Sequence, residues 1–385
     1  MPTHPIQTFH SVPPVRHAQL HVQNSRELLL QNFLADSRPW VVAYSGGKDS
    51  TLVLQLVIEM LCSLPATKLK PVHVISSDTG VEPPNIARYM HDSLQRIGEG
   101  ARQRRLNVIP HLVQPGAENG FWGNLIGKGY PPPTRWFRWC TSKMKINPTR
   151  DVIERITKDA GSVLLLLGTR FDESTHRGQG MKARESNSRG LNPHHQIPDA
   201  LVLSPIADWT SDQVWEYLFT NNPPPWGGSH DAMMALYRQA NSGECPLVMD
   251  LNTPSCGGSR FGCWTCTVVK TDKSMESFID NGEEWMLPLN RFRNWLKEIR
   301  EDESRRCRIR RTGEEGLGPF NSATRLELLE KLLLTEQEVG MELISNESLL
   351  YIQQVWTEEF DVMRSALRLA ARFGRRPMKR EAIAA

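Results

Sequence analysis

The segment VVAYSGGKDSTLVLQLVIEML, residues 41 to 61, constrains the fold of this chain more than any other part. Val41 to Tyr44 predicts a short buried strand, and the apolar run that begins near Thr51 predicts a helix. The loop between them, SGGKDS, has two adjacent glycines that let several backbone N–H groups point at one spot. Because a helix N-terminus also favours negative charge, the segment predicts an anion-binding site.

Side chains of this loop would strengthen the binding of an anion. Ser45 and Ser50 supply hydroxyl donors, and Lys48 supplies a positive charge. Asp49 could hold a phosphate-bound Mg²⁺. The spacing does not match GxxxxGK[ST], so the loop is not of the Walker type. An ordinary glycine turn would be the simpler explanation if the hexapeptide stood alone.

The next segment repeats the pattern of strand, turn and helix. Val72 to Ser76 predicts a strand that leads to Asp78, and Pro84 to Leu94 predicts a helix. Such a succession makes a right-handed unit with parallel strands, whose ligands lie beyond the carboxyl ends. Asp78 would then lie beside the anion loop and bind a ribose hydroxyl or Mg²⁺. A turn-capping role is the alternative.

Two further apolar runs, Asn107 to Val113 and Ser162 to Leu167, extend the predicted sheet. The second leads into Gly168, Thr169 and Arg170, with Arg177 further along. An arginine at the end of a central strand is costly unless it meets an anion. Arg170 and Arg177 are therefore candidate phosphate ligands.

The loop that follows the third predicted strand is rich in proline and glycine, as a substrate-binding loop can be. Aromatic and basic residues alternate in it: Arg135, Trp136, Phe137, Arg138 and Trp139. This pattern suits base stacking and phosphate contact, although at least one tryptophan is expected to cover the sheet edge instead. Cys140 follows, and Lys143 and Lys145 would lower the pKa of its thiol if they lie close.

Four of the seven cysteines fall within 22 residues: Cys245, Cys256, Cys263 and Cys266. The CxxC pair places two thiolates on one metal, and the surrounding Gly, Ser and Pro suit a loop that wraps a metal. Tetrahedral thiolate sites hold either zinc or an iron–sulfur cluster. We favour [4Fe–4S] over zinc because the spacing is uneven and the neighbouring motifs are those of sulfur activation.

Composition bounds the class of protein. The 385 residues carry a net charge of +3, no run approaches the length of a membrane span, and the N-terminus has no apolar signal core. These features predict a soluble, cytoplasmic protein with reduced cysteines. Basic residues are concentrated at 305 to 311 and 364 to 380, where a solvated face and phosphate contact are both possible.

The motifs SGGKDS, DTGVE, RWCTSKMK, GTRFDESTHR and SPIADWTSDQVWEYL, between about residues 40 and 220, resemble the PAPS-reductase-like branch of the PP-loop ATP pyrophosphatases. The resemblance implies an α/β fold with a parallel sheet flanked by helices, and an enzyme that splits ATP into AMP and pyrophosphate. Its implied nucleotide-binding residues are Ser45, Gly46, Gly47, Lys48, Asp49, Ser50, Asp78, Gly168, Arg170 and Arg177. An intact SGGKDS and the lack of a redox-cysteine tail argue against a sulfonucleotide reductase.

With GCWTCTVVKTDKSM added, the chain is similar to the DndC family of the bacterial DNA phosphorothioation system. That resemblance implies ATP, Mg²⁺ and a [4Fe–4S] cluster as cofactors, and DNA, a cysteine desulfurase and other Dnd proteins as partners. The candidate catalytic residues are Lys48, Asp49, Arg170 and Cys140. Three alternatives stay open: a tRNA thiolation enzyme, a sulfonucleotide reductase, and a non-catalytic scaffold that binds DNA or a partner.

The expected organisation has five parts. They are an irregular arm (1–24), the PP-loop domain (25–240), a four-cysteine module (241–275), a helical domain (276–370) and a basic tail (371–385). Residues 276 to 301, 323 to 334 and 347 to 359 have apolar side chains at helical spacing.

Overall fold

A six-stranded sheet forms the centre of the computed structural model, which describes residues 15–173, 190–194, 197, 199–240 and 262–378. The strands are β1 (Trp40–Ala43), β2 (Val72–Ser77), β3 (Val108–Val113), β4 (Val163–Leu166), β5 (Asn192–Pro193) and β6 (Ala200–Leu203). They lie in the order β3-β2-β1-β4-β6-β5, and every neighbouring pair is parallel except β5 with β6. The predicted parallel sheet is confirmed.

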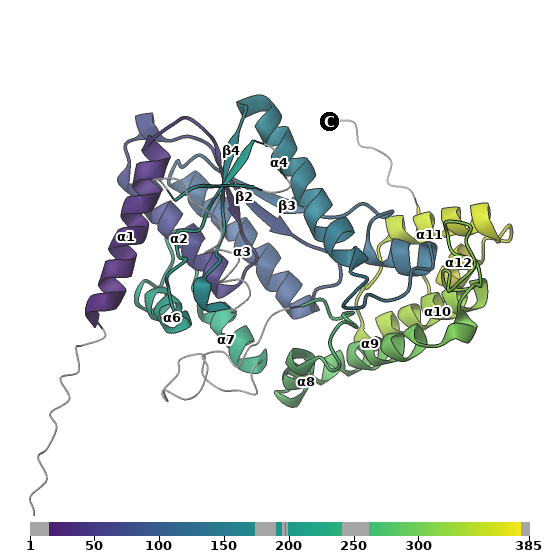
Figure 1. Cartoon of the computed structure of the whole chain (residues 1–385). Coiled ribbons are helices and arrows are strands. Elements are labelled where there is room, and N and C mark those ends of the chain that lie inside the picture. Colours follow the sequence, from purple (N-terminus) through teal and green to yellow (C-terminus); the bar gives the residue numbers. More distant parts are fainter. Residues whose placement is uncertain (1–14, 174–189, 195–196, 198, 241–261, 379–385) are drawn as a thin grey trace, which may run out of the picture.

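Helices cover both faces of this sheet (Figure 1). One face carries α1 (Val15–Leu34), α2 (Lys48–Ser63), α3 (Pro84–Gln103), α6 (Ser211–Thr220) and α7 (Asp231–Ala240). The other face carries α4 (Asn147–Ala160). Strand β4 supplies both cores, because Leu164 and Leu166 point to the first face while Val163 and Leu165 point to the second. A strand that is buried on both faces reads as a continuous apolar run.

Helix α1 corrects the prediction of an irregular arm over residues 1–24, because it begins at Val15. Its packed half buries Leu29 and Phe33 against the core. No proline or glycine interrupts residues 15 to 24, so the helix continues upstream from its packed half. The sequence pattern missed this extension because Leu20 is exposed and leaves no apolar period to read.

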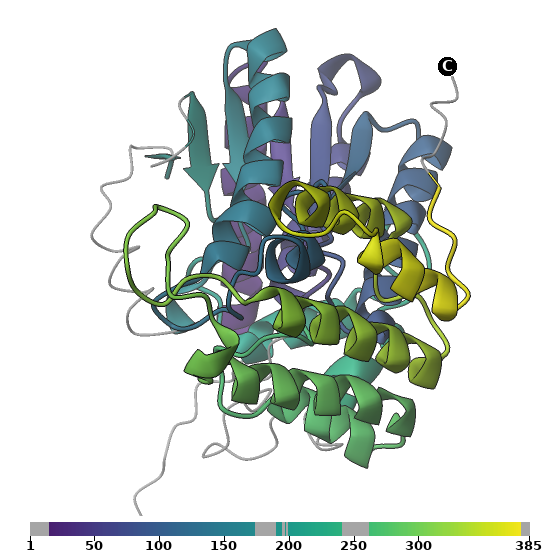
Figure 2. The same cartoon turned by 90° about the vertical axis from the view of Figure 1, so that its right-hand side faces the viewer.

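Beyond the sheet lies a helical C-terminal region, which faces the viewer in Figure 2. It consists of α8 (Lys273–Asp280), α9 (Leu287–Arg300), α10 (Ser322–Val339), α11 (Asn346–Glu359) and α12 (Ser365–Arg372). The predicted helical stretch 276–301 is divided in the structure, since Gly282 has a φ of 102° that a helix does not allow. One apolar core joins these helices to the loop after β3, for example Phe292 and Trp356 with Trp122.

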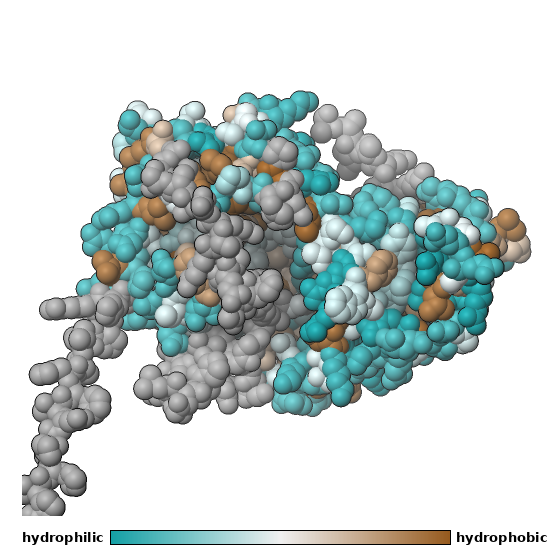
Figure 3. All heavy atoms as spheres, in the orientation of Figure 1, coloured by the Kyte–Doolittle hydropathy of each residue, from teal (hydrophilic) through white to brown (hydrophobic). Residues whose placement is uncertain are grey.

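The surface of the C-terminal region is mostly hydrophilic in the view of Figure 3, with apolar residues scattered among polar ones. Within the part of the chain that the structure describes, no helix has both the length and the apolar character needed to span a membrane.

Candidate nucleotide and cysteine site

The anion loop lies where three parallel strands end at one edge of the sheet. Because β1 pairs with both β2 and β4, the carboxyl ends of these strands bring together Ser45, Asp78 and Gly168. Helix α2 begins at Lys48, three residues earlier than predicted, so most of the charged part of SGGKDS forms its first turn. This shift places Asp49 at the N-terminus of the helix.

The N-cap residue of α2 is Gly47, which has no side chain to cap the helix, and the first helical amide, that of Lys48, donates to the Tyr237 hydroxyl at 3.4 Å. By contrast, α6, α8, α10 and α11 are capped by the side chains of Thr210, Asp272, Asn321 and Ser345. Among the described residues, the amides of Gly46 and Gly47 donate to no protein acceptor. Uncapped amides at a helix N-terminus form a ready site for a phosphate group.

The backbone of the loop is held in shape by its own serines. The Ser45 amide donates to Ser50 Oγ at 3.1 Å, and Ser50 Oγ donates to the Gly47 carbonyl at 2.9 Å. Gly46 has a φ of 72°, and a Cβ there would lie 3.3 Å from the Tyr89 ring. The two serines thus shape the loop, in addition to the donor role that the sequence predicts for them.

Three charged side chains of alternating sign lie beside the anion loop. Lys48 Nζ lies 2.8 Å from one carboxylate oxygen of Asp49, and Arg170 Nε donates to the other oxygen at 2.8 Å. Arg170 is buried and also donates to the Trp209 carbonyl at 3.1 Å. The candidate catalytic residues Lys48, Asp49 and Arg170 are therefore brought together, and Asp172, which the sequence analysis left unassigned, lies 3.5 Å from the same guanidinium.

Gly168 is required by a close approach between β4 and α2. A Cβ at this position would lie 2.8 Å from the carbonyl carbon of Asp49 and 2.9 Å from the amide nitrogen of Ser50. We expect Gly168→Ala to lower the free energy of unfolding by about 1–3 kcal/mol and to weaken ATP binding, because the added methyl must displace the first turn of α2. Denaturant titration and calorimetry measure the two effects. Gly120→Ala is the control, since a Cβ there would lie 3.5 Å from its nearest neighbour, the Gly116 carbonyl oxygen, which is an ordinary contact distance; equal behaviour of the two variants would contradict this account.

The Asp78 carboxylate accepts hydrogen bonds from neighbouring groups of the protein. It accepts from the Gly80 amide at 2.8 Å, from Gln114 at 2.8 Å and from His91 at 2.9 Å. Although burial opposes it, these hydrogen bonds hold the pKa of Asp78 below its usual value. The turn-capping alternative thus accounts for its contacts, and a ribose or Mg²⁺ contact stays a prediction.

The described cysteines of the predicted metal site lie against the loop after β2. The Trp264 amide donates to the Val81 carbonyl at 2.9 Å, and Thr79 Oγ1 lies 3.7 Å from Cys263 Sγ. The Cys266 amide closes the CxxC turn on the Cys263 carbonyl at 3.0 Å. The CxxC turn is thus attached to the same sheet edge as the anion loop.

Cys140 also belongs to this neighbourhood, which the sequence did not show. It packs in the same core as Cys263, and the charge of Cys266 acts on it. Burial raises the pKa of the Cys140 thiol and Cys266 adds to the rise, which corrects the predicted lowering by Lys143 and Lys145. Burial likewise raises the pKa of Cys263 to about 12.

Several predicted ligands lie outside the described residues, namely Arg177, Cys245 and Cys256. Within the described ranges no group of three or more His, Cys, Asp or Glu side chains is arranged to hold a metal ion. Two of the four predicted ligands, Cys263 and Cys266, lie in the described part, and thiols are the donors that zinc and iron–sulfur clusters require. Loading such a site would release protons, because its ligands are thiolates.

Helix α9 holds the segment that follows the CxxC turn. Arg293, which is only 1% exposed, donates to the carbonyl oxygens of Cys266, Val269 and Lys270. One helical turn or two further along, Lys297 donates to the Lys270 carbonyl and Arg300 to the Thr267 carbonyl. The sequence did not predict this role, because Arg293 lies in an ordinary amphipathic helix and belongs to no recognisable motif.

We expect Arg293→Gln to lower the free energy of unfolding by about 2–4 kcal/mol, because several buried carbonyls would lose their donor. Denaturant titration measures this loss. Arg291→Gln is the matched control on the same helix, since its ion pair with Glu338 is exposed and worth about 1 kcal/mol or less. A loss no larger than that of the control would show that Arg293 does not hold the turn.

Three segments could contact nucleic-acid phosphates: 135–139, 305–311 and 364–380. In the first of them, residues 135–138 are free to contact a nucleic acid. The exposed residues are Arg135, Trp136, Phe137 and Arg138. Trp139 is buried, in agreement with the expectation that at least one tryptophan would pack against the protein. Thr134 holds this segment as a turn, accepting from the Trp136 and Phe137 amides.

Many arginines of the other two segments bind the protein itself. Arg305 pairs with Glu327 at 2.5 Å and Arg311 with Glu359 at 2.8 Å. Arg375, within the predicted basic tail, pairs with Glu336 at 2.5 Å. These cations stabilise the helical region, so their clustering in the sequence overstated the exposed positive charge.

Comparison with known proteins decides the family. The model of the phosphoadenosine phosphosulfate reductase domain matches residues 39–269, more than half of the chain. The chain belongs to this family. Its matched part contains the sheet, the anion loop and the CxxC turn, so the predicted PP-loop fold with a helical C-terminal region is confirmed.

Two curated relatives align with about half of this chain. The uncharacterized protein MJ0066 of Methanocaldococcus jannaschii is 29% identical over 187 residues, which are 49% of this chain and 32% of that protein. Sulfate adenylyltransferase subunit 2 of Rhizobium sp. strain BR816 is 27% identical over 198 residues, which are 48% of this chain and 58% of the relative. The chain thus spans between a third and three fifths of these relatives.

Similar solved structures include U34-tRNA thiolase NcsA from Methanococcus maripaludis with its [4Fe–4S] cluster. It is 12% identical, with a TM-score of 0.34, covering 75% of this chain and 81% of that one. Candida glabrata FMN adenylyltransferase in complex with FMN and an ATP analogue is 14% identical, with a TM-score of 0.37, covering 61% of this chain and 64% of that one. Likenesses at this level assign no reaction.

Proposed function

We propose that this protein is an ATP pyrophosphatase that adenylates an oxygen of a nucleic acid so that sulfur can replace it. The observation that carries the proposal is the uncapped N-terminus of α2, with Lys48, Asp49 and buried Arg170 arranged around it. Free amides and two cations suit a triphosphate, and the Asp49 carboxylate suits the Mg²⁺ that accompanies it.

In the proposed reaction, an acceptor oxygen attacks the α-phosphorus of ATP and pyrophosphate leaves. The amides of Gly46 and Gly47 would stabilise the charge that develops on the departing pyrophosphate, with Lys48 beside them. A sulfide-level nucleophile then attacks the adenylated centre, and AMP leaves with the oxygen. The net change at the acceptor is one oxygen replaced by one sulfur.

The cysteine site would serve the second half of this reaction. Cys263 and Cys266 would hold a [4Fe–4S] cluster together with Cys245 and Cys256, which lie outside the described residues, and zinc is the other metal that this donor set accepts. Cys140, which lies beside the CxxC turn, would handle the sulfur. The cluster would supply a soft, thiophilic centre near the anion loop. The chain itself contributes the attachment of the CxxC turn to Val81 and the donors on α9.

DNA is the proposed acceptor. The exposed segment 135–138 supports this choice, because its tryptophan could stack on a base and its two arginines could contact phosphates. A cysteine desulfurase as sulfur donor, and other phosphorothioation proteins as partners, are proposed on the resemblance alone.

The first test is pyrophosphate release from ATP by anaerobically purified protein, with duplex DNA, single-stranded DNA or tRNA added. Stimulation by DNA, together with sulfur found in the DNA backbone, would support the proposal. Stimulation and thiolation of tRNA would transfer it to a tRNA thiolation enzyme, and thioredoxin-dependent sulfite formation would indicate a reductase. No pyrophosphate under any condition would leave the scaffold alternative.

We expect Trp136→Ala to weaken binding of the acceptor nucleic acid by about five- to a hundredfold, because stacking of one base on an aromatic ring is worth about 1–3 kcal/mol. Fluorescence anisotropy with labelled DNA measures the change. Val362→Ala is the control, since Val362 is also an exposed apolar residue, at 82%, on another surface. Equal affinities of the two variants would exclude a stacking role for Trp136.

A further inference from the structure

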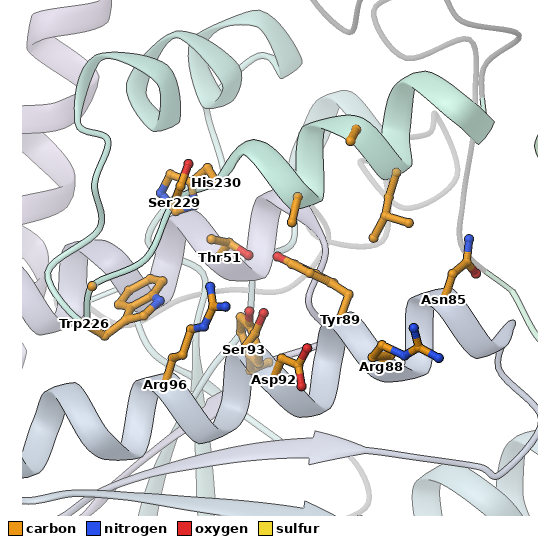
Figure 4. Close-up of a pocket in the computed structure, with 15 residues that line it drawn as sticks. Thr51, Asn85, Arg88, Tyr89, Asp92, Ser93, Arg96, Trp226, Ser229 and His230 are labelled. Atoms are coloured by element: carbon orange, nitrogen blue, oxygen red, sulfur yellow. The ribbon is translucent and has the colours of Figure 1, made fainter. Parts of the chain in front are cut away.

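A pocket of about 320 Å³, open to solvent on one side, lies between α3 and α7, next to the first turn of α2 (Figure 4). It is called the cavity below. Tyr44 and Thr51 line it from the end of β1 and the start of α2, while Tyr89 and Arg96 line it from α3. Trp226 lines it from the segment before α7. None of the residues assigned above to the nucleotide or to the metal lines this cavity, but it adjoins the anion loop, because Tyr89 packs against Gly46.

Fixed walls and small side chains explain why the space exists. Ala232 and Ala235, one turn apart on α7, line the cavity and leave room that larger residues would fill. Trp226 is nearly buried, and α3 approaches its backbone so closely that a Cβ on Gly100 would lie 2.5 Å from the Trp226 carbonyl oxygen. The tryptophan wall is therefore held in place by the fold.

The polar groups of the cavity favour an anion. Arg88 and Arg96 lie two turns apart on α3 with Asp92 between them. All three are exposed along the open side of the pocket, and among the described residues none of them forms an ion pair. Figure 4 shows the Arg96 guanidinium directed into the space between Trp226 and Thr51. Its tip lies against Gly228, where a Cβ would be 2.9 Å from Arg96 Nη1.

His230 does not add charge at this end of the cavity. Burial lowers its pKa to about 4, and its Nε2 lies 2.8 Å from Gln55 Oε1. The cation beside Trp226 is thus Arg96, next to two aromatic walls, Trp226 and Tyr89. An unpaired guanidinium beside aromatic surface suits a phosphate carried on a planar ring.

We propose that this cavity is a second binding site, for a nucleoside monophosphate, with the phosphate at Arg96 and the base along Trp226. Its volume lies at the small end of the range for ligand pockets, about 300–1,000 Å³, which fits one nucleotide and not two. The inference stands apart from the proposed reaction, since it uses no residue of the anion loop.

The test is calorimetric titration of the full-length protein with AMP after the anion loop has been saturated with a non-hydrolysable ATP analogue. We expect a saturable second site for AMP. Arg96→Gln should weaken it roughly ten- to a hundredfold, because a charge-assisted phosphate contact is lost. Ala235→Trp should abolish it by filling the space. Both variants should keep wild-type binding of the ATP analogue, which verifies that they are folded.

Adenosine and orthophosphate separate the two halves of the proposal. Each should bind at least tenfold more weakly than AMP. If adenosine binds as tightly as AMP, the phosphate contact is excluded, and if orthophosphate does, the ring site is excluded. No second site for AMP, or a site that both variants leave unchanged, would overturn the proposal. A failure to bind the ATP analogue would count against the proposed function alone, because AMP would then be titrated without the analogue into the wild type, Arg96→Gln and Ala235→Trp, with thermal unfolding as the control for folding.

Discussion

Asp49→Ala should reduce pyrophosphate release from ATP by roughly a hundred- to a thousandfold, the range observed when one electrostatic group of a charge-stabilising site is removed. Asp49 sits between Lys48 Nζ and Arg170 Nε, at 2.8 Å from each. Its loss would leave both cations without the carboxylate that positions them and would remove the proposed Mg²⁺ ligand. Release of pyrophosphate in a coupled phosphate assay measures the effect.

Asp172→Ala is the control for this variant. Its carboxylate lies 3.5 Å from the same guanidinium, but the side chain is 61% exposed, so its loss should cost about 1 kcal/mol or less. Thermal unfolding of both variants should stay close to that of the wild type. Wild-type pyrophosphate release by a folded Asp49→Ala protein would refute the ATP pyrophosphatase proposal.

Cys263→Ser should lose most of the metal, whereas Cys140→Ser should keep it. Anaerobically purified wild-type protein is expected to contain about four irons and four labile sulfides per chain, and Cys263→Ser a small fraction of that. Pyrophosphate release should persist, because neither thiol contacts the described side chains of the anion loop, whereas sulfur transfer should disappear. Cys140 is the informative position, since the sequence alone did not place it with the CxxC pair.

Cys62→Ser provides the matched control, because Cys62 is exposed on α2 and far from the CxxC turn in the sequence. It should keep the full iron content. Iron that is unaffected by Cys263→Ser would remove Cys263 from the proposed ligands, and sulfur transfer that persists in Cys140→Ser would exclude the proposed role of Cys140. Zinc in place of iron would retain the cysteine site and refute the cluster.

The sheet and the anion loop were predictable because local signals agreed with the global fold. The apolar runs at β1, β2 and β4 are buried on both faces, so each reads as a strand without reference to the rest of the chain. The glycines of SGGKDS predicted the turn because glycine readily adopts a positive φ, and Gly46 has a φ of 72°. Binding residues that share one strand edge follow directly from such an order of elements.

Contacts between distant segments could not be predicted in the same way. The ion pair between Asp49 and Arg170 joins residues 121 positions apart, and the sequence assigned both of them to a ligand instead of to each other. Arg293 and Cys140 carried no signal, because a single arginine or cysteine acquires its role only from the segments packed against it. Clustered arginines misled for the converse reason, since Glu327 and Glu359, which pair with them, lie far along the chain.

The attachments of the CxxC turn would determine when the proposed metal can be loaded. Its partners come from three separate places: the Val81 carbonyl after β2, the Pro133 carbonyl after β3, and Arg293 on α9. None of these groups is near the turn until the sheet and the C-terminal helices have folded and docked. The metal would therefore enter a chain that is already folded, and delivery of iron and sulfide would be the last step in producing an active molecule.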